Sequence, residues 1–220
     1  MGSLAQTSGT PTVRRRRTQF SLRSLLLLVL LMSLASGWLA EGVARGRRQA
    51  AAVAHLQRFP GRIRYDYQDQ GRAQEPPQPA WARQILGDDF FCDVEDVCLG
   101  GGKQFTDADL AHVRQFPALK RLSLAGARIS NEGMENVAQL HELQVLNLSA
   151  TPITDHGLAH LAGLNRLQRL WLRRTSITDA GATHLRQLRG LRTLDVKDSR
   201  ITPRGVASLR QALPLCEITY

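Results

Sequence analysis

A chain of 220 residues with a formal net charge of +10 has room for one large domain or two small ones. The positive charge is concentrated at the start: residues 1–64 hold eleven arginines and one acidic residue, whereas residues 65–220 hold eighteen basic and eighteen acidic residues. A nucleic-acid-binding protein carries its basic patch on the folded module itself. The distribution therefore argues against nucleic-acid binding.

The N-terminal residues predict a membrane segment. Residues 1–19 are polar and include the run Arg14–Arg17, which is typical of a disordered basic segment. Within residues 20–40, the run Leu25–Ala40 has sixteen residues without a charge. A membrane-spanning helix usually has about 20 apolar residues, and bilayer thinning or snorkelling tolerates shorter ones. We therefore expect residues 20–40 to form a transmembrane signal-anchor helix.

The flanking arginines predict its topology. The cluster before the apolar run favours a single-pass protein of the cell membrane, with a cytoplasmic N-terminus and the C-terminal part outside. Arg45, Arg47 and Arg48 weaken this asymmetry, because they lie on the other flank. The alternative is a cleavable signal peptide, with Ser33-Leu34-Ala35 as the cleavage site and a secreted product.

Residues 41–93 are expected to form a juxtamembrane helix, a strand and an N-terminal capping region. Good helix formers predict a helix over residues 41–59, ended by Pro60-Gly61. Strict alternation predicts a half-buried strand over Arg62–Tyr67, and a short helix over Trp81–Leu86 follows a linker rich in Gln and Pro. Since an uncovered first repeat would leave its apolar face in water, we expect this region to cover the end of the repeats that follow.

Residues 94–220 contain a repeat of 24 residues. Val94, Val97 and Leu99 show its apolar spacing before the four central repeats, and Leu215, Ile218 and Tyr220 show it after them, so six strands are expected. The central repeats share five positions, occupied by Leu119, Leu143, Leu167 and Leu191; Leu122, Leu146, Leu170 and Leu194; Leu124, Leu148, Leu172 and Val196; Ile129, Ile153, Ile177 and Ile201; and Gly133, Gly157, Gly181 and Gly205.

Each repeat position has a physical role. The leucines should point into one core, and the residues between them should face outward from a strand. Hydroxyl groups after the strand, at Thr151, Thr175 and Ser199, can bond the backbone of the turn. A helix then begins, and the repeated glycine should allow helix and sheet to approach closely. The expected N-caps are Thr106, Ser130, Thr154, Thr178 and Thr202.

The pattern L-x-x-L-x-L-x-x-[ATS]-x-I-[ST]-x-x-G resembles the leucine-rich repeat, whose periods are about 20–29 residues. The fuller form ITDxGLxxLxxLxxLxxLxL is similar to the cysteine-containing and related repeats and looks most like those of bacterial membrane-anchored repeat proteins. Phe20–Leu25 and Leu86–Phe91 are similar to the same group. The resemblance implies an α/β solenoid, with a parallel β-sheet on the concave face and short helices on the convex face.

The outward residues of adjacent strands should form columns about 4.8 Å apart on the concave face. Trp171 lies between arginines in the sequence, and an exposed tryptophan among arginines is typical of an interface hot spot. The alternative is that its ring merely covers neighbouring strands beside solubilising arginines. The candidate binding residues are Arg121, Asn147, Arg169, Trp171, Arg173, Arg174, Asp195 and Lys197.

Other side chains predict no chemistry. We find no nucleophile arrangement or pair of carboxylates that indicates an enzyme, a cofactor or a small-molecule substrate. His112, His160 and His184 share a repeat position without an acid or cysteine fixed beside them, so no metal site is expected. Cys92, Cys98 and Cys216 follow no zinc spacing; they are expected as free thiols, with a Cys92–Cys98 disulfide as the alternative.

The sequence therefore predicts a non-enzymatic, membrane-tethered protein that recognises a protein partner through its concave face. An acidic partner is favoured, because residues 110–220 contain fifteen basic and eight acidic residues. The alternative is a structural envelope or spacer component that packs laterally through its convex face.

Overall fold

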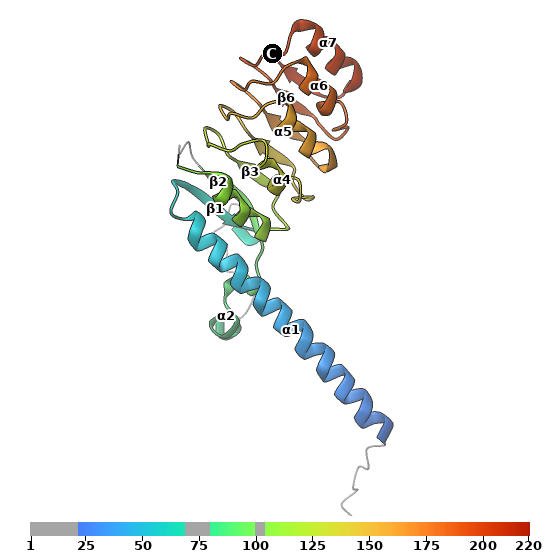
Figure 1. Cartoon of the computed structure of the whole chain (residues 1–220). Coiled ribbons are helices and arrows are strands. Elements are labelled where there is room, and N and C mark those ends of the chain that lie inside the picture. Colours follow the sequence, from blue (N-terminus) through green and yellow to red (C-terminus); the bar gives the residue numbers. More distant parts are fainter. Residues whose placement is uncertain (1–21, 69–79, 100–103) are drawn as a thin grey trace, which may run out of the picture. The chain divides into compact units, whose positions relative to one another are not determined.

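The computed structural model describes residues 22–68, 80–99 and 104–220, which fall into two compact units divided between Ala40 and Glu41. The segment 1–19, predicted to be disordered, lies outside the described residues. The first unit contains the N-terminal part of helix α1 (Leu22–Leu56). The second unit contains the rest of α1 and the repeats (Figure 1).

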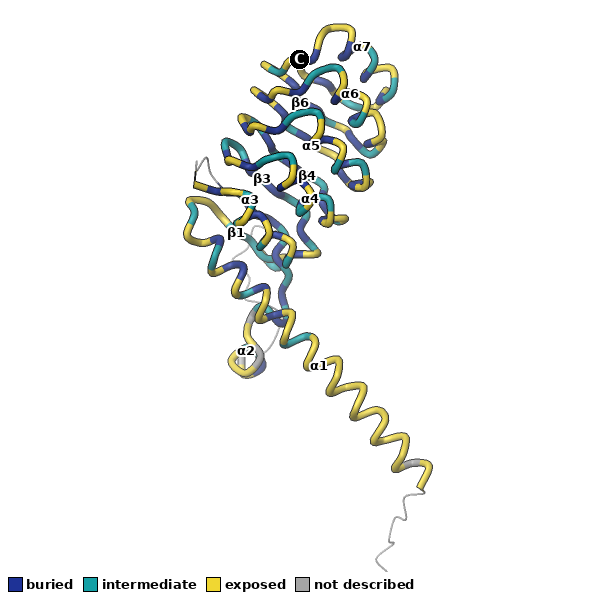
Figure 2. The backbone as a smooth tube through the Cα atoms, in the orientation of Figure 1, coloured by how far each residue is buried: buried dark blue, intermediate teal, exposed yellow. Residues whose placement is uncertain are grey.

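Helix α1 is continuous over 35 residues and joins the two helices that the sequence predicted separately. Residues 41–56 have good helix formers and no proline, so nothing stops the first helix near Ala40. Up to Ala40 the described side chains are exposed (Figure 2). Among the described residues, α1 is the helix long and apolar enough to cross a membrane, a test of length and composition that a signal sequence also passes.

An antiparallel strand pair opens the second unit. Strand β1 (Gly61–Tyr65) pairs with β2 (Val94–Leu99), with Ile63 opposite Val97. Between them lie the 3-10 helix η1 (Asp66–Gln68), helix α2 (Ala80–Leu86) and the 3-10 helix η2 (Asp88–Phe90). From α1, Leu56 is fully buried in the same core as β2, so α1 and β1 both pack at this end of the repeats.

The repeats form a parallel sheet. Strands β2 to β7 are parallel neighbours in chain order, which confirms the six predicted strands, and β1 adds an antiparallel strand at the edge. The strands after β2 are β3 (Arg121–Ser123), β4 (Val145–Asn147), β5 (Arg169–Trp171), β6 (Thr193–Asp195) and β7 (Glu217–Thr219).

Short helices return the chain from each strand to the next (Figure 1). They are α3 (Asp107–Leu110), η3 (Ala111–Gln115), α4 (Met134–Val137), α5 (Asp155–Ala159), η4 (His160–Gly163), α6 (Asp179–Leu185) and α7 (Pro203–Ala212). The repeated leucines and isoleucines fill one core between helices and sheet, as predicted.

The turn after each strand has a fixed conformation. The buried hydroxyl groups of Thr151 and Thr175 donate to the carbonyl oxygens of Leu148 and Leu172, each at 2.6 Å, as the repeat pattern predicted. The preceding residue has a positive φ: Ala150 at 56° and Arg174 at 53°. The backbone therefore turns left-handed at the same place in successive repeats.

The sequence suggested that the repeated glycine lets helix and sheet approach closely. In the structure, the atom nearest to a Cβ at this position belongs to a side chain of the preceding repeat. A Cβ atom added at Gly181 would collide first with the carboxylate of Asp155, in the preceding repeat. Asp155 also accepts hydrogen bonds from the backbone N–H and the hydroxyl of Thr178, at 2.8 and 2.6 Å. The glycine thus makes room for a side chain that links two repeats.

Candidate functional site: the concave face

The strand register arranges the outward side chains in rows. Arg169 pairs with Val145 on one side and Thr193 on the other, and Trp171 pairs with Asn147 and Asp195. Because the parallel strands pair without a shift from β2 to β7, each side chain keeps its place relative to its neighbours. The predicted columns on the concave face are therefore confirmed.

Trp171 lies between two hollows of this face. One has a volume of 400 Å³ and is lined by Trp171 with Arg169, Arg121 and Arg64, among others. The second has a volume of 710 Å³ and is lined by Trp171 with Arg173, among others. The half-buried indole is thus shared by two adjacent concave sites, each with arginines at its wall.

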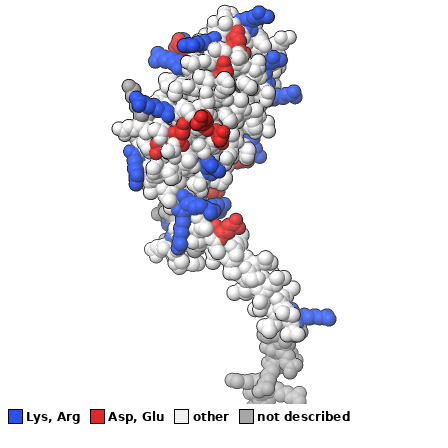
Figure 3. Space-filling view, viewed as in Figure 1, with Lys and Arg blue, Asp and Glu red and all other residues white. Residues whose placement is uncertain are grey.

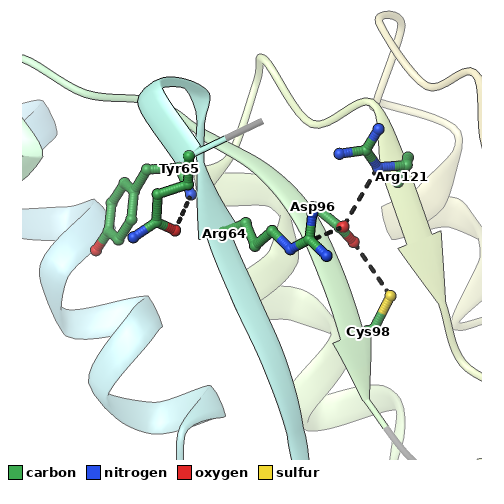
Figure 4. A network of polar contacts seen from close by, with 6 residues as sticks. Arg64, Tyr65, Asp96, Cys98 and Arg121 are labelled. Atoms are coloured by element: carbon green, nitrogen blue, oxygen red, sulfur yellow. Dashed lines mark hydrogen bonds and ion pairs between the residues drawn. The ribbon is translucent and has the colours of Figure 1, made fainter. Parts of the chain in front are cut away.

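A buried carboxylate holds the arginines of the first hollow. Asp96, only 3% exposed, lies 3.3 Å from Nε of Arg121 and 4.0 Å from Nε of Arg64 (Figure 4). The thiol of Cys98 donates to the same carboxylate at 3.1 Å. The carboxylate of Asp96 thus contacts two of the guanidinium groups that line this hollow. Asp96 therefore helps to orient Arg64 and Arg121.

Cys98 is not suited to act as a nucleophile. Burial raises the pKa of its thiol, and the hydrogen bond to Asp96 and the charge of that carboxylate raise it further; Arg62 acts in the opposite direction, and the net pKa is raised. The thiol is therefore protonated at neutral pH, and the thiolate is the reactive form of cysteine. Its role in this site is to donate a hydrogen bond.

The second hollow contains paired charges. Nε of Arg173 lies 3.7 Å from Asp195, and Nε of Arg174 lies 3.6 Å from Asp198. Arg169, by contrast, is exposed, and within the part of the chain that the structure describes no acidic group lies at ion-pair distance from it. Arg169 is therefore the cation beside Trp171 that is best placed to meet an external anion.

Three candidate residues have local roles. The side-chain oxygens of Asn147 and Asp195 each accept the backbone N–H two residues further on, from Ser149 and Lys197, both at 3.0 Å. These bonds shape the start of the turn that follows each strand. Lys197 is exposed in that turn and lines neither of the two hollows described above.

Sequence reasoning missed the contribution of β1. Arg62 and Arg64 line the smaller hollow from β1, and Asp96 and Cys98 line it from β2. The alternation in β1 correctly indicated a strand, but its antiparallel pairing with a strand more than thirty residues later carries no local signal. The repeat pattern could not include β1, because β1 precedes the first repeat.

The described parts of the chain show no candidate metal site. Residues 22–68, 80–99 and 104–220 contain no group of three histidine, cysteine or acidic side chains arranged to hold a metal ion. His112 instead stacks on His55, with ring centroids 4.1 Å apart, and His55 bonds Asp109 at 2.8 Å. Figure 3 shows one cluster of acidic side chains on the repeats and further acidic and basic side chains spread over the same face, so this face is not uniformly basic.

Comparison with known proteins agrees with this architecture. Residues 117–138 match the family model described as Leucine Rich repeat. The second unit has the fold of leucine-rich repeats, a parallel sheet with short helices. The match covers one repeat, and the 24-residue register extends the same unit along the sheet from β3 to β7. No curated protein matches the chain.

Several solved leucine-rich-repeat structures are similar to it. An internalin from Listeria monocytogenes is 24% identical, with 50% of this chain and 30% of the internalin covered and a TM-score of 0.43. The ectodomain of the receptor kinase SOBIR1 from Arabidopsis thaliana is 12% identical, with 79% and 97% covered and a TM-score of 0.44. The plant peptide hormone receptor RGFR1, solved in complex with RGF2, is 13% identical, with 50% and 18% covered and a TM-score of 0.33. The chain spans less than a third of the internalin and less than a fifth of that hormone receptor.

Proposed function

We propose that this protein is a non-enzymatic, membrane-tethered leucine-rich-repeat protein that captures an acidic protein segment on its concave face. The observation that carries the proposal is the position of Trp171, shared by two hollows and flanked by arginines. Tryptophan and arginine are the residues most enriched at the centres of protein interfaces. An extended partner would place an apolar side chain against the indole and carboxylates toward the arginines.

The charges of the face support an acidic partner. Among the described residues, no acidic group lies at ion-pair distance from Arg169, and Arg64 and Arg121 both contact the carboxylate of Asp96. The side chains of Arg64 and Arg121 are 33% and 34% exposed and that of Asp96 is 4% exposed, so the guanidinium groups are the more accessible charges in this hollow. Arginine binds carboxylates through two parallel N–H donors, so the face is suited to Asp and Glu side chains.

Helix α1 supports the proposed tether. Its apolar run from Leu25 to Ala40 is preceded by a cluster of arginines, which supports an uncleaved anchor with the N-terminus in the cytoplasm and the repeats outside. Protease added to intact cells should then digest the repeats and leave the N-terminus protected. Protection of the repeats would contradict this topology, and a mature chain that begins after Ala35 would favour secretion.

The test of recognition is a crosslinking pull-down from membranes that contain the protein. We compare the wild type with the triple variant Arg169→Ala/Trp171→Ala/Arg173→Ala. The matched control is Arg186→Ala/Gln187→Ala/Arg189→Ala, which removes the same charge beside a hollow of the helix side. Circular dichroism establishes that each variant is folded.

A partner captured by the wild type and the control, but lost by the first variant, supports recognition through the concave face. If the first variant captures the same set as the wild type, the concave face is not the site. Loss of a partner, or of a second copy of the chain, by the helix-side variant alone would instead favour lateral packing through the convex face.

A further inference from the structure

Helix α2 exposes an apolar face. Trp81 is 66% exposed and Ile85 is 74% exposed. The two residues are four positions apart, so they lie on the same side of the helix. Ala82, which faces another side, is 7% exposed and buried against the rest of the unit. The buried side therefore fixes the helix, and the exposed side presents a tryptophan and an isoleucine.

Hydrogen bonds join α2 to η2. The backbone N–H of Gly87 donates to the carbonyl oxygen of Arg83 at 2.7 Å, and that of Phe90 donates to Gly87 at 3.3 Å. The two short helices thus form one tight turn, in which Gly87 has a φ of 84°. The position of η2 consequently determines the position of α2.

This turn packs directly on the part of α1 that belongs to the second unit, close to where that unit begins at Glu41. A Cβ atom at Gly42 would be 2.5 Å from the ring of Phe90, and one at Gly46 would be 3.1 Å from the carbonyl oxygen of Asp89. One turn further along α1, the buried amide of Gln49 donates to the carbonyl oxygen of Cys92 at 2.7 Å. A Cβ atom would collide with the ring of Phe90 at Gly42 and would be tight against the backbone at Gly46, so both glycines favour this close approach.

This contact lies next to the end of the apolar run. Gly42 follows Ala40 by two residues, a rise of about 3 Å along a helix. Arg45, Arg47 and Arg48, which come next on α1, are exposed. Arginines just beyond an apolar helix lie at the depth of phospholipid headgroups, and tryptophan is enriched at the same depth. Helix α2 is thus joined, through η2, to the part of α1 that begins just after the apolar run in the sequence.

We propose that Trp81 and Ile85 enter the interfacial layer of the bilayer that α1 crosses, which makes α2 a second membrane contact. This inference rests on the membrane tether of the proposed function. The ligand is the lipid surface itself: the indole and isoleucine side chains meet the upper acyl chains, and the exposed arginines of α1 meet the phosphates. With two attachments, the repeat unit is held against the membrane and does not swing freely on one helix.

The chain carries its own probes, because its three tryptophans lie at three separate sites: Trp38 in the apolar run, Trp81 on α2 and Trp171 on the concave face. Full-length variants that each keep one tryptophan, with phenylalanine at the other two positions, are reconstituted in vesicles of zwitterionic and anionic phospholipid. Fluorescence is compared between ordinary lipid and lipid brominated near the top of the acyl chains. Circular dichroism checks the fold of each variant.

We expect brominated lipid to quench Trp38 and Trp81 and to leave Trp171 unchanged. Quenching of Trp38 without quenching of Trp81 overturns the second contact and leaves the tether intact. If neither is quenched, the tether itself fails, and the second contact fails with it. Emission of Trp81 that depends on protein concentration but not on bromination points to a second copy of the chain and also overturns the proposal.

A second variant tests whether quenching at position 81 reflects insertion of the whole exposed face of α2 or an effect of that one residue. Ile85→Trp is introduced into a chain whose native tryptophans are all replaced by phenylalanine. Quenching by brominated lipid is then measured one helical turn away, on the same exposed face. Quenching at position 85 as well as at position 81 supports insertion of the face. Quenching at neither position, in a folded protein, contradicts it.

Discussion

Asp179 accepts two hydrogen bonds from Thr202, the N-cap of the next repeat's helix: the backbone N–H lies 2.8 Å from Oδ1 and the hydroxyl lies 2.6 Å from Oδ2. The equivalent pair one repeat earlier is Asp155 and Thr178. Each link joins a residue to another 23 positions later, so it couples adjacent repeats and not residues within one repeat. In a solenoid, such nearest-neighbour contacts determine how far unfolding is cooperative.

Removal of one link should weaken the interface between two repeats. We expect Asp155→Ala to lower the free energy of unfolding by about 1–2 kcal/mol, because Thr178 loses a charged acceptor for both of its donors. Urea unfolding of the solubilised full-length chain, followed by circular dichroism, measures the change. Glu135→Ala is the control: this exposed acid of α4 should change stability by less than about 0.5 kcal/mol. Equal effects of the two substitutions would contradict a special role for the link.

The repeated glycine should not tolerate even a methyl group. In Gly181→Ala the new Cβ collides with Asp155 and comes within 2.8 Å of Ile177, so we expect a loss of about 1–3 kcal/mol. Gly163→Ala is a matched control in the same part of the chain, because a Cβ there meets no atom within 4 Å. Its melting temperature should not fall, whereas that of Gly181→Ala should. A neutral Gly181→Ala would show that the glycine is not required by packing.

A substitution in the turn should stabilise the protein. Ala150 is exposed and has a φ of 56°, a left-handed conformation that costs a residue with a Cβ atom roughly 1 kcal/mol. Gly126 occupies the equivalent position of the preceding repeat with a φ of 74°. We therefore expect Ala150→Gly to raise the midpoint of urea unfolding. A lower midpoint would mean that the greater freedom of glycine in the unfolded chain outweighs the relief of strain.

Two carboxyl groups predict a loss of stability in acid. Hydrogen bonds from Thr202 lower the pKa of Asp179 from the ordinary value of 3.8. For Asp109, burial raises the pKa, but hydrogen bonds from His55 and Thr106 outweigh it, and the net pKa is lowered. Groups with lowered pKa contribute stability that is complete above the unfolded pKa and disappears as the pH falls through the folded one. This contribution should therefore be constant at neutral pH and lost below about pH 4.

Urea titrations at a series of pH values measure this loss. In Thr202→Val, Asp179 keeps only the backbone donor, so the decrease in stability below pH 4 should be smaller than in the wild type. A pH dependence that the substitution leaves unchanged would show that the Asp179–Thr202 link does not contribute to it.

The sequence was sufficient for the repeats because their signal is periodic. Leu170, Leu194 and their equivalents keep a spacing of 24 residues, and the strand pairs have that same register. The links were not foreseen: Asp155 could be recognised as a residue of the first helical turn, but its bond to the next repeat depends on how the repeats stack. The sequence therefore did not show that a glycine is needed at position 181 to leave room for Asp155.

The contacts of α1 and β1 in the second unit could not be predicted from the sequence, because these elements lie outside the repeat pattern. The face of α1 that packs in the second unit includes Gly46 and Gln49, which are buried although neither is a typical core residue. Small and polar residues on a helix indicate solvent unless the partner is known. The pairing of Arg64 with Asp96 likewise depends on two strands that are distant in the sequence.

The measurement that tests recognition by the concave face most directly is site-specific photocrosslinking in intact membranes. A photoreactive residue replaces Trp171 or its neighbour Asn147 in one pair of variants, and Gln187 on the helix side in a control. We predict that positions 171 and 147 crosslink to the same partner and that position 187 does not. Adducts from position 187 alone, or different adducts from positions 171 and 147, would contradict a single binding site on the concave face.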